Sequence, residues 1–80
     1  MEHVVYVLES EKDHGLYIGV TKDLSSRLRR HNYGLVRSTK ARRPFRVIGS
    51  KHFVTFEEAR AVEVMLKAFK DPVRVRTWIA

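Results

Sequence analysis

Residues 3–8, HVVYVL, form an unbroken run of β-branched and aromatic side chains. Such a run predicts a β-strand that is buried on both faces, because a strand with one wet face alternates apolar and polar side chains. Eighty residues with 44% apolar content are enough for one small domain with a modest core. We therefore expect residues 1–80 to form a single domain that contains this buried strand.

A second strand is predicted over residues 16–21, LYIGVT, and the polar stretch between the two runs has the length of a hairpin loop. If the hairpin pairs Tyr6 with Gly19, then Tyr6 and Tyr17 lie on the same face of the sheet, since strand side chains alternate with a period of two. A register slip of one residue would separate the two tyrosines.

A helix is predicted after the hairpin. Thr21 or Asp23 can cap its start, its pattern extends to about Tyr33, and Gly34 is a good terminator. The inward stripe of this helix would consist of Leu24, Leu28 and His31, with Arg27 beside it. The outward side chains would be Ser25, Ser26, Arg29 and Arg30.

The second half of the chain predicts a basic loop over residues 34–44, a third strand over residues 45–54 with a bulge at Gly49-Ser50, and a second helix. Thr55 followed by Glu58 is a capping box that starts this helix, and Asp71-Pro72 ends it. The tail VRVRTWI alternates like a short strand, which would return its last two residues to the core.

Positive charge is concentrated in the middle of the chain. The sequence has 16 Lys and Arg against 9 Asp and Glu, a net charge of +7. Residues 22–46 hold nine of the basic residues and one acid, Asp23. A basic segment set apart from acidic ones is typical of a protein that binds a phosphate backbone, and a merely soluble protein of high isoelectric point is the alternative.

The composition also excludes several classes of protein. Without cysteine, the chain has neither a disulfide framework nor a thiolate metal site. It lacks an apolar run of about 18 residues, and Glu2 and His3 do not fit the start of a secretory signal. We therefore expect a cytoplasmic protein that does not contact a membrane.

Arg27 and His31 lie one helical turn apart, so their side chains are neighbours on the first helix. An arginine fork can hold phosphate oxygens, and a histidine can accept or relay a proton near neutral pH. When these two residues are considered alone, a basic helix with a half-buried histidine is the favoured interpretation.

Glu63 is the acid that lies beside the apolar stripe of the second helix. A carboxylate in this place is a hard-oxygen ligand of the kind that Mg²⁺ or Mn²⁺ accepts. The alternative is a salt bridge to a neighbouring Lys or Arg, which is the favoured interpretation for Glu63 alone.

The basic loop that contains residues 37–43, RSTKARR, either follows a phosphate backbone or is a solvated, mobile loop. We predict that this loop and the first helix supply the nucleic-acid contacts, through Arg30, Arg37, Thr39, Lys40, Arg42 and Arg43.

The order of these motifs resembles the GIY-YIG nuclease family, and its small single-domain branch in particular. The second family motif is intact at residues 17–19, YIG, and the first occurs as residues 4–6, VVY, where Val4 replaces the usual glycine. Further similar positions are Arg27, His31-Asn32, residues 38–40, residues 43–45 and residues 57–59 with Glu63. The resemblance covers about residues 3–70, and the tail from Asp71 lacks the late asparagine found near the site in several members.

The resemblance implies an α+β fold in which helices flank a small three-stranded antiparallel sheet. It also implies hydrolysis of phosphodiester bonds with one divalent metal ion, Mg²⁺ or Mn²⁺. By the same resemblance, Glu63 matches the metal ligand, Arg27 the arginine that stabilises phosphate charge, and His31 a histidine that assists proton transfer. Tyr6 and Tyr17 match the two motif tyrosines, of which one is the general base.

The function that we predict is a divalent-metal-dependent endonuclease that acts on duplex or branched DNA. We expect a role in DNA repair or recombination and a protein partner that supplies specificity. The first alternative is a non-catalytic nucleic-acid-binding module that retains the fold. The second is a protein-interaction domain that uses residues 73–79 as an added sheet edge.

Overall fold

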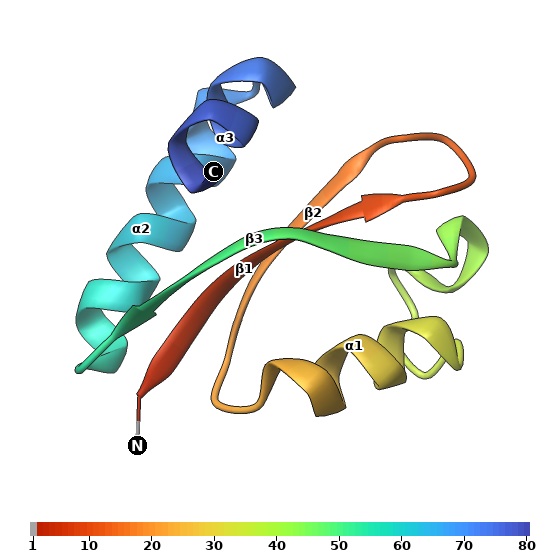
Figure 1. The fold of residues 1–80 in the computed structure, drawn as a ribbon, viewed down its shortest axis with the longest axis horizontal. Coiled ribbons are helices and arrows are strands. Elements are labelled where there is room, and N and C mark those ends of the chain that lie inside the picture. Colours follow the sequence, from red (N-terminus) through yellow and green to blue (C-terminus); the bar gives the residue numbers. More distant parts are fainter. Residues whose placement is uncertain (1) are drawn as a thin grey trace.

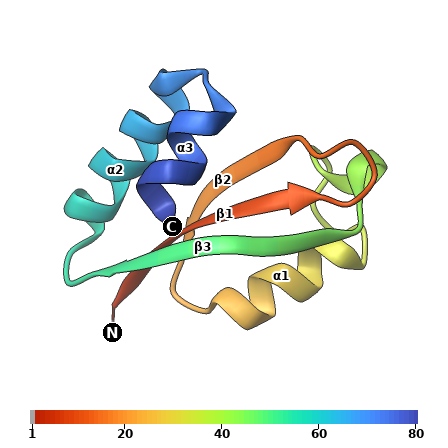
Figure 2. The same cartoon turned by 45° about the horizontal axis from the view of Figure 1, so that its top comes forward.

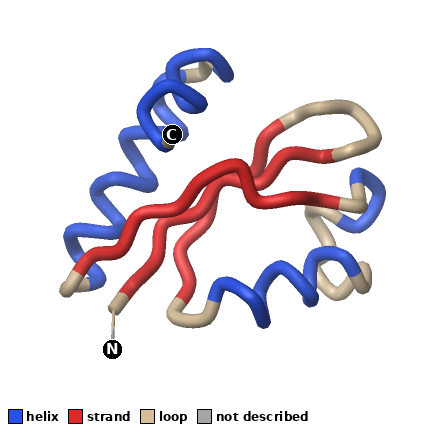
Figure 3. The backbone as a smooth tube through the Cα atoms, in the orientation of Figure 1, coloured by secondary structure: helices blue, strands red, loops and turns tan. Residues whose placement is uncertain are grey.

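The computed structural model describes residues 2–80. Its strands are β1 (His3–Ser10), β2 (Leu16–Thr21) and β3 (Phe45–Phe53), and its helices are α1 (Leu24–Asn32), α2 (Phe56–Phe69), α3 (Pro72–Ile79) and a short 3-10 helix, η1 (Lys40–Arg42). The strands form one antiparallel sheet in the order β2-β1-β3, with α1 against one face and α2 and α3 against the other (Figures 1 and 3). The predicted α+β fold is therefore confirmed.

The central strand β1 is covered on both faces, as its sequence predicts. Val5 and Val7 pack with α2 and α3, whereas Tyr6 and Leu8 pack on the side of α1. None of these four side chains is more than 1% exposed. Figure 2 shows β1 between its two partner strands, with helices on either side of the sheet.

Within residues 2–80, no helix is long and apolar enough to cross a bilayer.

The hairpin has the register that places the two motif tyrosines together. Tyr6 pairs with Gly19 and Leu8 pairs with Tyr17, so Tyr6 and Tyr17 lie on the same face, as predicted. Gly19 is required at its position, because a Cβ atom there would lie 2.5 Å from the Tyr6 hydroxyl oxygen. The glycine of the second motif thus makes room for the tyrosine of the first.

Helix α1 begins and ends close to the predicted residues. Asp23, rather than Thr21, is its cap, and the Asp23 carboxylate accepts a hydrogen bond from the Ser26 backbone N–H at 3.1 Å. Gly34 follows the helix with a φ of +76°, the left-handed conformation that glycine adopts readily. The segment after Gly34 was expected to be a loop, and it also contains the one turn of η1.

Strand β3 and helix α2 also follow their sequence signals. The β3 register shifts between the partners of Val7 and Leu8, so the bulge lies at Ile48 and Gly49, next to the predicted Gly49-Ser50. The Thr55 hydroxyl accepts from the Glu58 N–H at 3.2 Å, so Thr55 caps α2 as predicted, and it also donates to the Glu58 carboxylate at 3.0 Å.

The tail from residue 73 is a helix, and the prediction of a short strand there is wrong. Asp71 caps α3 by accepting from the Val73 N–H at 3.0 Å, and Pro72 occupies the first helical turn, where its missing N–H costs nothing. Val75 and Ile79 are buried at a spacing of four, whereas Val73 is 69% exposed. The alternation of valines and arginines therefore resembled a strand, although the buried side chains have helical spacing. Because residues 73–79 form a helix, they offer no sheet edge to a partner.

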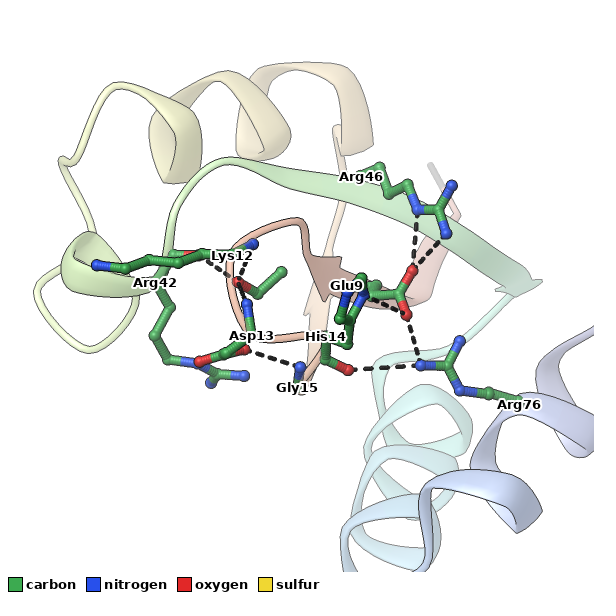
Figure 4. A network of polar contacts seen from close by, with 9 residues as sticks. Glu9, Lys12, Asp13, His14, Gly15, Arg42, Arg46 and Arg76 are labelled. Atoms are coloured by element: carbon green, nitrogen blue, oxygen red, sulfur yellow. Dashed lines mark hydrogen bonds and ion pairs between the residues drawn. The ribbon is translucent and has the colours of Figure 1, made fainter.

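Glu9 joins three elements at the far end of β1 (Figure 4). Its buried carboxylate accepts from the Arg76 guanidinium of α3 at 2.6 Å and from Nε of Arg46 in β3 at 2.9 Å. These hydrogen bonds, with the Arg76 bond first, lower the pKa of the Glu9 carboxyl from 4.5 to about 2. The carboxylate is therefore an ionised junction between α3 and the sheet.

This junction predicts a pH dependence of stability. Since the pKa of Glu9 is lower in the folded state, its contribution is complete above pH 4.5 and is lost as the pH falls from 4.5 towards 2. In Glu9→Gln, we expect the free energy of unfolding, measured by urea titration, to fall less over this range than in the parent protein. The control is Glu11→Gln, which removes a neighbouring exposed carboxylate. Parallel losses in Glu9→Gln and the parent protein would contradict the prediction.

Candidate active site

The hydroxyl group of Tyr6 lies inside the protein, on the face of the sheet covered by α1. The Tyr6 side chain is 1% exposed, and its oxygen lies 3.2 Å from Nε2 of His31. Burial, together with the nearby Tyr17, raises the pKa of the Tyr6 hydroxyl to about 12, while the charge of Arg27 acts in the opposite direction. The phenol is therefore protonated in the resting site.

His31 occupies the last turn of α1 and is fully buried. The centroid of its ring lies 4.8 Å from that of Tyr17 and 6.0 Å from that of Phe45. Burial lowers the pKa of the imidazole, and the charges of Arg27 and Arg30 lower it further. Near neutral pH the ring is consequently neutral and can accept a proton.

The hydroxyl of Thr39 determines which nitrogen of His31 carries the hydrogen. It lies 2.8 Å from Nδ1 of His31 and donates to the backbone carbonyl oxygen of Val36 at 3.3 Å. Since this hydroxyl has one hydrogen and donates it to Val36, we assign the ring N–H to Nδ1, from which the hydroxyl accepts. The lone pair of Nε2 then accepts the hydroxyl hydrogen of Tyr6, which gives the chain Tyr6 to His31 to Thr39 to Val36.

Thr39 therefore has a different place from the one expected for it. It was predicted among the nucleic-acid contacts, but its side chain is fully buried behind His31. Its position in a basic loop suggested a surface residue, and no sequence periodicity showed that the loop folds back onto α1.

Arg27 lies one turn before His31 on α1 and is half-buried. Its positive charge acts to lower the pKa of both Tyr6 and His31, so the guanidinium lies within electrostatic reach of both side chains. Within residues 2–80 the guanidinium makes no ion pair and no hydrogen bond, which leaves it available to an anion. Tyr17, also half-buried, places its ring centroid 6.3 Å from that of Tyr6.

Glu63 is buried on α2, and both of its oxygens are engaged. Arg60 Nη1 lies 2.7 Å from Oε1 and Lys67 Nζ lies 3.2 Å from Oε2. The salt bridges expected as the alternative for Glu63 are thus present, although both partners are more than half exposed and can swing into solvent. The Glu63 charge raises the pKa of Tyr6, which indicates that it lies within electrostatic reach of the tyrosine.

Glu63 offers one carboxylate, so a divalent ion bound there would keep most of its water. Within residues 2–80, no three acidic or histidine side chains form a cage for a metal ion. Mg²⁺ is nevertheless commonly held by one or two carboxylates, with water and substrate phosphate as its other ligands. A single buried carboxylate such as Glu63 is compatible with that arrangement.

The other residues predicted to contact nucleic acid differ in their surroundings. Arg30, Arg37, Lys40 and Arg43 are exposed on α1 and around η1. Arg42 instead pairs with Asp13 through its Nε at 3.2 Å and lies over the Phe45 ring at 5.7 Å. Arg42 thus ties η1 to the hairpin.

Comparison with known proteins identifies the family. The family model described as the GIY-YIG catalytic domain matches residues 2–74. The chain belongs to the GIY-YIG family. The resemblance inferred from the tyrosine and YIG motifs is thus confirmed, and the family is one of nucleases.

Several relatives belong to a small single-domain branch of the GIY-YIG family, the UPF0213 proteins. A UPF0213 protein of Streptococcus pneumoniae is 41% identical over 75 residues, which cover 90% of this chain and 75% of the relative. Another from Staphylococcus saprophyticus is 36% identical over 76 residues, with 94% and 92% coverage. The solution NMR structure of a UPF0213 protein from Bacillus halodurans shares the fold, with a TM-score of 0.52, 30% identity, and coverage of 96% of this chain and 94% of that one.

The Thr39 contact predicts the tautomer of His31. Long-range ¹H–¹⁵N correlation spectra of the neutral ring should show hydrogen on Nδ1 in the parent protein and in Thr39→Ser, which keeps the hydroxyl. In Thr39→Val the Nδ1 hydrogen loses its acceptor, so we expect the other tautomer to appear and stability to fall by about 1–3 kcal/mol. Hydrogen on Nε2 in the parent protein would contradict the assignment.

Proposed function

We propose that this protein is a divalent-metal-dependent endonuclease that hydrolyses phosphodiester bonds in DNA. The observation that carries the proposal is the hydrogen bond of the Tyr6 hydroxyl to a neutral His31, with a 3.2 Å separation between Tyr6 Oη and Nε2, beside an unpaired Arg27. A buried phenol next to a proton acceptor and an arginine is suited to proton removal close to a phosphate. Membership of a nuclease family supports the same conclusion.

In this proposal, Arg27 binds the phosphate and balances the negative charge that develops on it in the transition state. Transfer of the Tyr6 hydroxyl hydrogen to Nε2 of His31 leaves a phenolate oxygen that can take a proton from the attacking water. The positive charge of Arg27 favours this phenolate, because it opposes part of the rise in the Tyr6 pKa that burial and Tyr17 cause. Glu63 would hold the divalent ion, which supplies Lewis-acid stabilisation of the phosphate and the leaving oxygen.

The two tyrosines are alternatives for the base. Tyr6 has a proton acceptor in His31 but is almost fully buried, whereas Tyr17 is half-buried and closer to solvent. The Tyr6→Phe and Tyr17→Phe variants distinguish the two, because the variant that loses the base has the lower rate constant for cleavage of bound DNA.

A non-catalytic nucleic-acid-binding module is the second candidate, and one observation favours it. Both Glu63 oxygens are bound by the side chains of Arg60 and Lys67, so an ion must displace two cations to reach the carboxylate. A binding module would have no need to open these ion pairs.

A plasmid-nicking assay with Mg²⁺ or Mn²⁺ separates the two candidates. We expect the parent protein to convert supercoiled DNA to the nicked form and Arg27→Ala to reduce the rate by about 10²–10³-fold, the size of effect seen when one transition-state donor is removed. The matched control is Arg29→Ala, which removes an exposed arginine from the same helix. Glu63→Gln should abolish the metal response, whereas Glu57→Gln, at an exposed position of α2, should retain it.

DNA binding without cleavage in either metal would contradict the enzyme and support the binding module. Equal rates for Arg27→Ala and Arg29→Ala, both shown to be folded by circular dichroism, would remove Arg27 from the site.

A further inference from the structure

Basic side chains from two separate segments line a hollow beside η1. The hollow has a volume of about 520 Å³ and is lined by Lys12, Arg37, Lys40, Ala41 and Arg43. Lys12 comes from the loop between β1 and β2, whereas Lys40 and Ala41 belong to η1 and Arg37 and Arg43 flank it. None of the candidate active-site residues lines it. The sequence predicted a basic loop here, but it did not show that Lys12 completes a concave surface.

The cations of this hollow are free of acidic partners. Within residues 2–80, Lys12, Arg37, Lys40 and Arg43 make no ion pair with a carboxylate. Arg42, in the middle of the same segment, differs from them because it pairs with Asp13 and lies over Phe45. Four unpaired cations with no acid among the lining residues create a positive potential that favours an anion.

Hydrogen bonds between the hairpin and the segment around η1 hold the two walls of the hollow together. The ammonium group of Lys12 donates to the carbonyl oxygen of Ala41 at 3.3 Å, and the buried Ser10 hydroxyl donates to the carbonyl oxygen of Arg42. The Glu11 N–H donates to the carbonyl oxygen of Pro44 at 2.8 Å. Figure 4 shows the hairpin residues Lys12 and Asp13 close to Arg42 of η1. The hollow is therefore built into the fold and does not depend on one mobile loop.

Gly34 lies against Arg43 and Lys40, two of the residues that line the hollow. A Cβ atom at this position would lie 1.9 Å from Nη1 of Arg43 and 3.3 Å from Cγ of Lys40. The guanidinium of Arg43 thus lies directly on the backbone after α1, where the positive φ of Gly34 also excludes most other residues. This contact fixes Arg43 next to Lys40.

We propose that this hollow binds a backbone phosphate of the nucleic-acid substrate, at a distance from the phosphate that is cleaved. Arginine forks and lysine ammonium groups are the side chains that position a nucleic-acid backbone, and four of them exceed what one small anion needs. The assignment of the ligand as nucleic acid rests on the proposed function.

Binding in the hollow would also support the candidate active site. Thr39 immediately precedes Lys40, and the Arg42 N–H donates to the Thr39 carbonyl oxygen at 3.0 Å. A phosphate held by Lys40 and Arg43 therefore fixes the segment whose Thr39 hydroxyl orients His31.

The test measures DNA binding without cleavage. Fluorescence anisotropy of a labelled 20-base-pair duplex is recorded over a series of NaCl concentrations, with EDTA present, for the full chain and for Lys12→Gln, Arg37→Gln, Lys40→Gln and Arg43→Gln. The matched control is Arg74→Gln, which removes the same charge from an exposed position of α3, on the other face of the sheet.

Each phosphate contact contributes about 0.9 to the slope of log K against log salt on duplex DNA. We expect the hollow variants to reduce this slope by about that amount for each contact that is lost, and Arg74→Gln to leave it unchanged. Slopes in all hollow variants equal to that of Arg74→Gln would overturn the proposal. Because four variants are compared, one that fails to fold does not decide the outcome.

Inorganic phosphate at constant ionic strength distinguishes a small anion from a backbone phosphate. If phosphate displaces the duplex from the parent protein at low millimolar concentration, the hollow is a site for a small phosphate ligand and the nucleic-acid assignment is overturned. If the slopes change as expected but no metal supports cleavage, the hollow stands and the proposed endonuclease fails.

Discussion

The burial of β1 on both faces is the constraint on which the other contacts depend. An 80-residue chain has few residues with which to cover a sheet, and here α1 covers one face of β1 while α2 and α3 cover the other. Because strand side chains alternate, Val5 and Val7 supply the α2–α3 core and Tyr6 is directed to the α1 side. A strand with one wet face could leave the Tyr6 hydroxyl in water. In this fold the hydroxyl is buried and needs a partner inside the protein.

The buried Tyr6 hydroxyl needs a hydrogen-bond partner, and this need accounts for the residues around it. The phenol has room only because Gly19 lacks a side chain, and its hydrogen is accepted by His31. His31 is then also buried, so its second nitrogen must be satisfied by Thr39. The same contacts that stabilise a small core produce a neutral imidazole in a defined tautomer. Stability and the candidate chemistry thus share one chain of hydrogen bonds.

The parts of this arrangement that depend on local chain geometry could be predicted from the sequence. Period-two alternation predicted a shared face for Tyr6 and Tyr17 if Tyr6 pairs with Gly19, the register that the structure has, and helical spacing predicted Arg27 beside His31. The role of Thr39 could not be predicted, because it depends on how an aperiodic segment returns to α1. The tail was mispredicted for a related reason: Val73 and Val75 alternate in sequence, and only the cap at Asp71 and the burial of Ile79 distinguish a helix from a strand.

The pairing of charges divides the basic residues into two groups with different roles. Arg46 and Arg76 pair with the buried Glu9, and Arg42 pairs with Asp13, so these guanidinium groups join β3, α3 and η1 to β1 and its hairpin. Arg27 and the cations of the hollow have no such partner within residues 2–80. Since an ion pair with a protein carboxylate already satisfies a guanidinium, the unpaired group is the one that a phosphate can bind without first breaking a contact. The net charge does not distinguish these two groups. The ion pairs do, because they identify which arginines stabilise the fold and which are free to bind an anion.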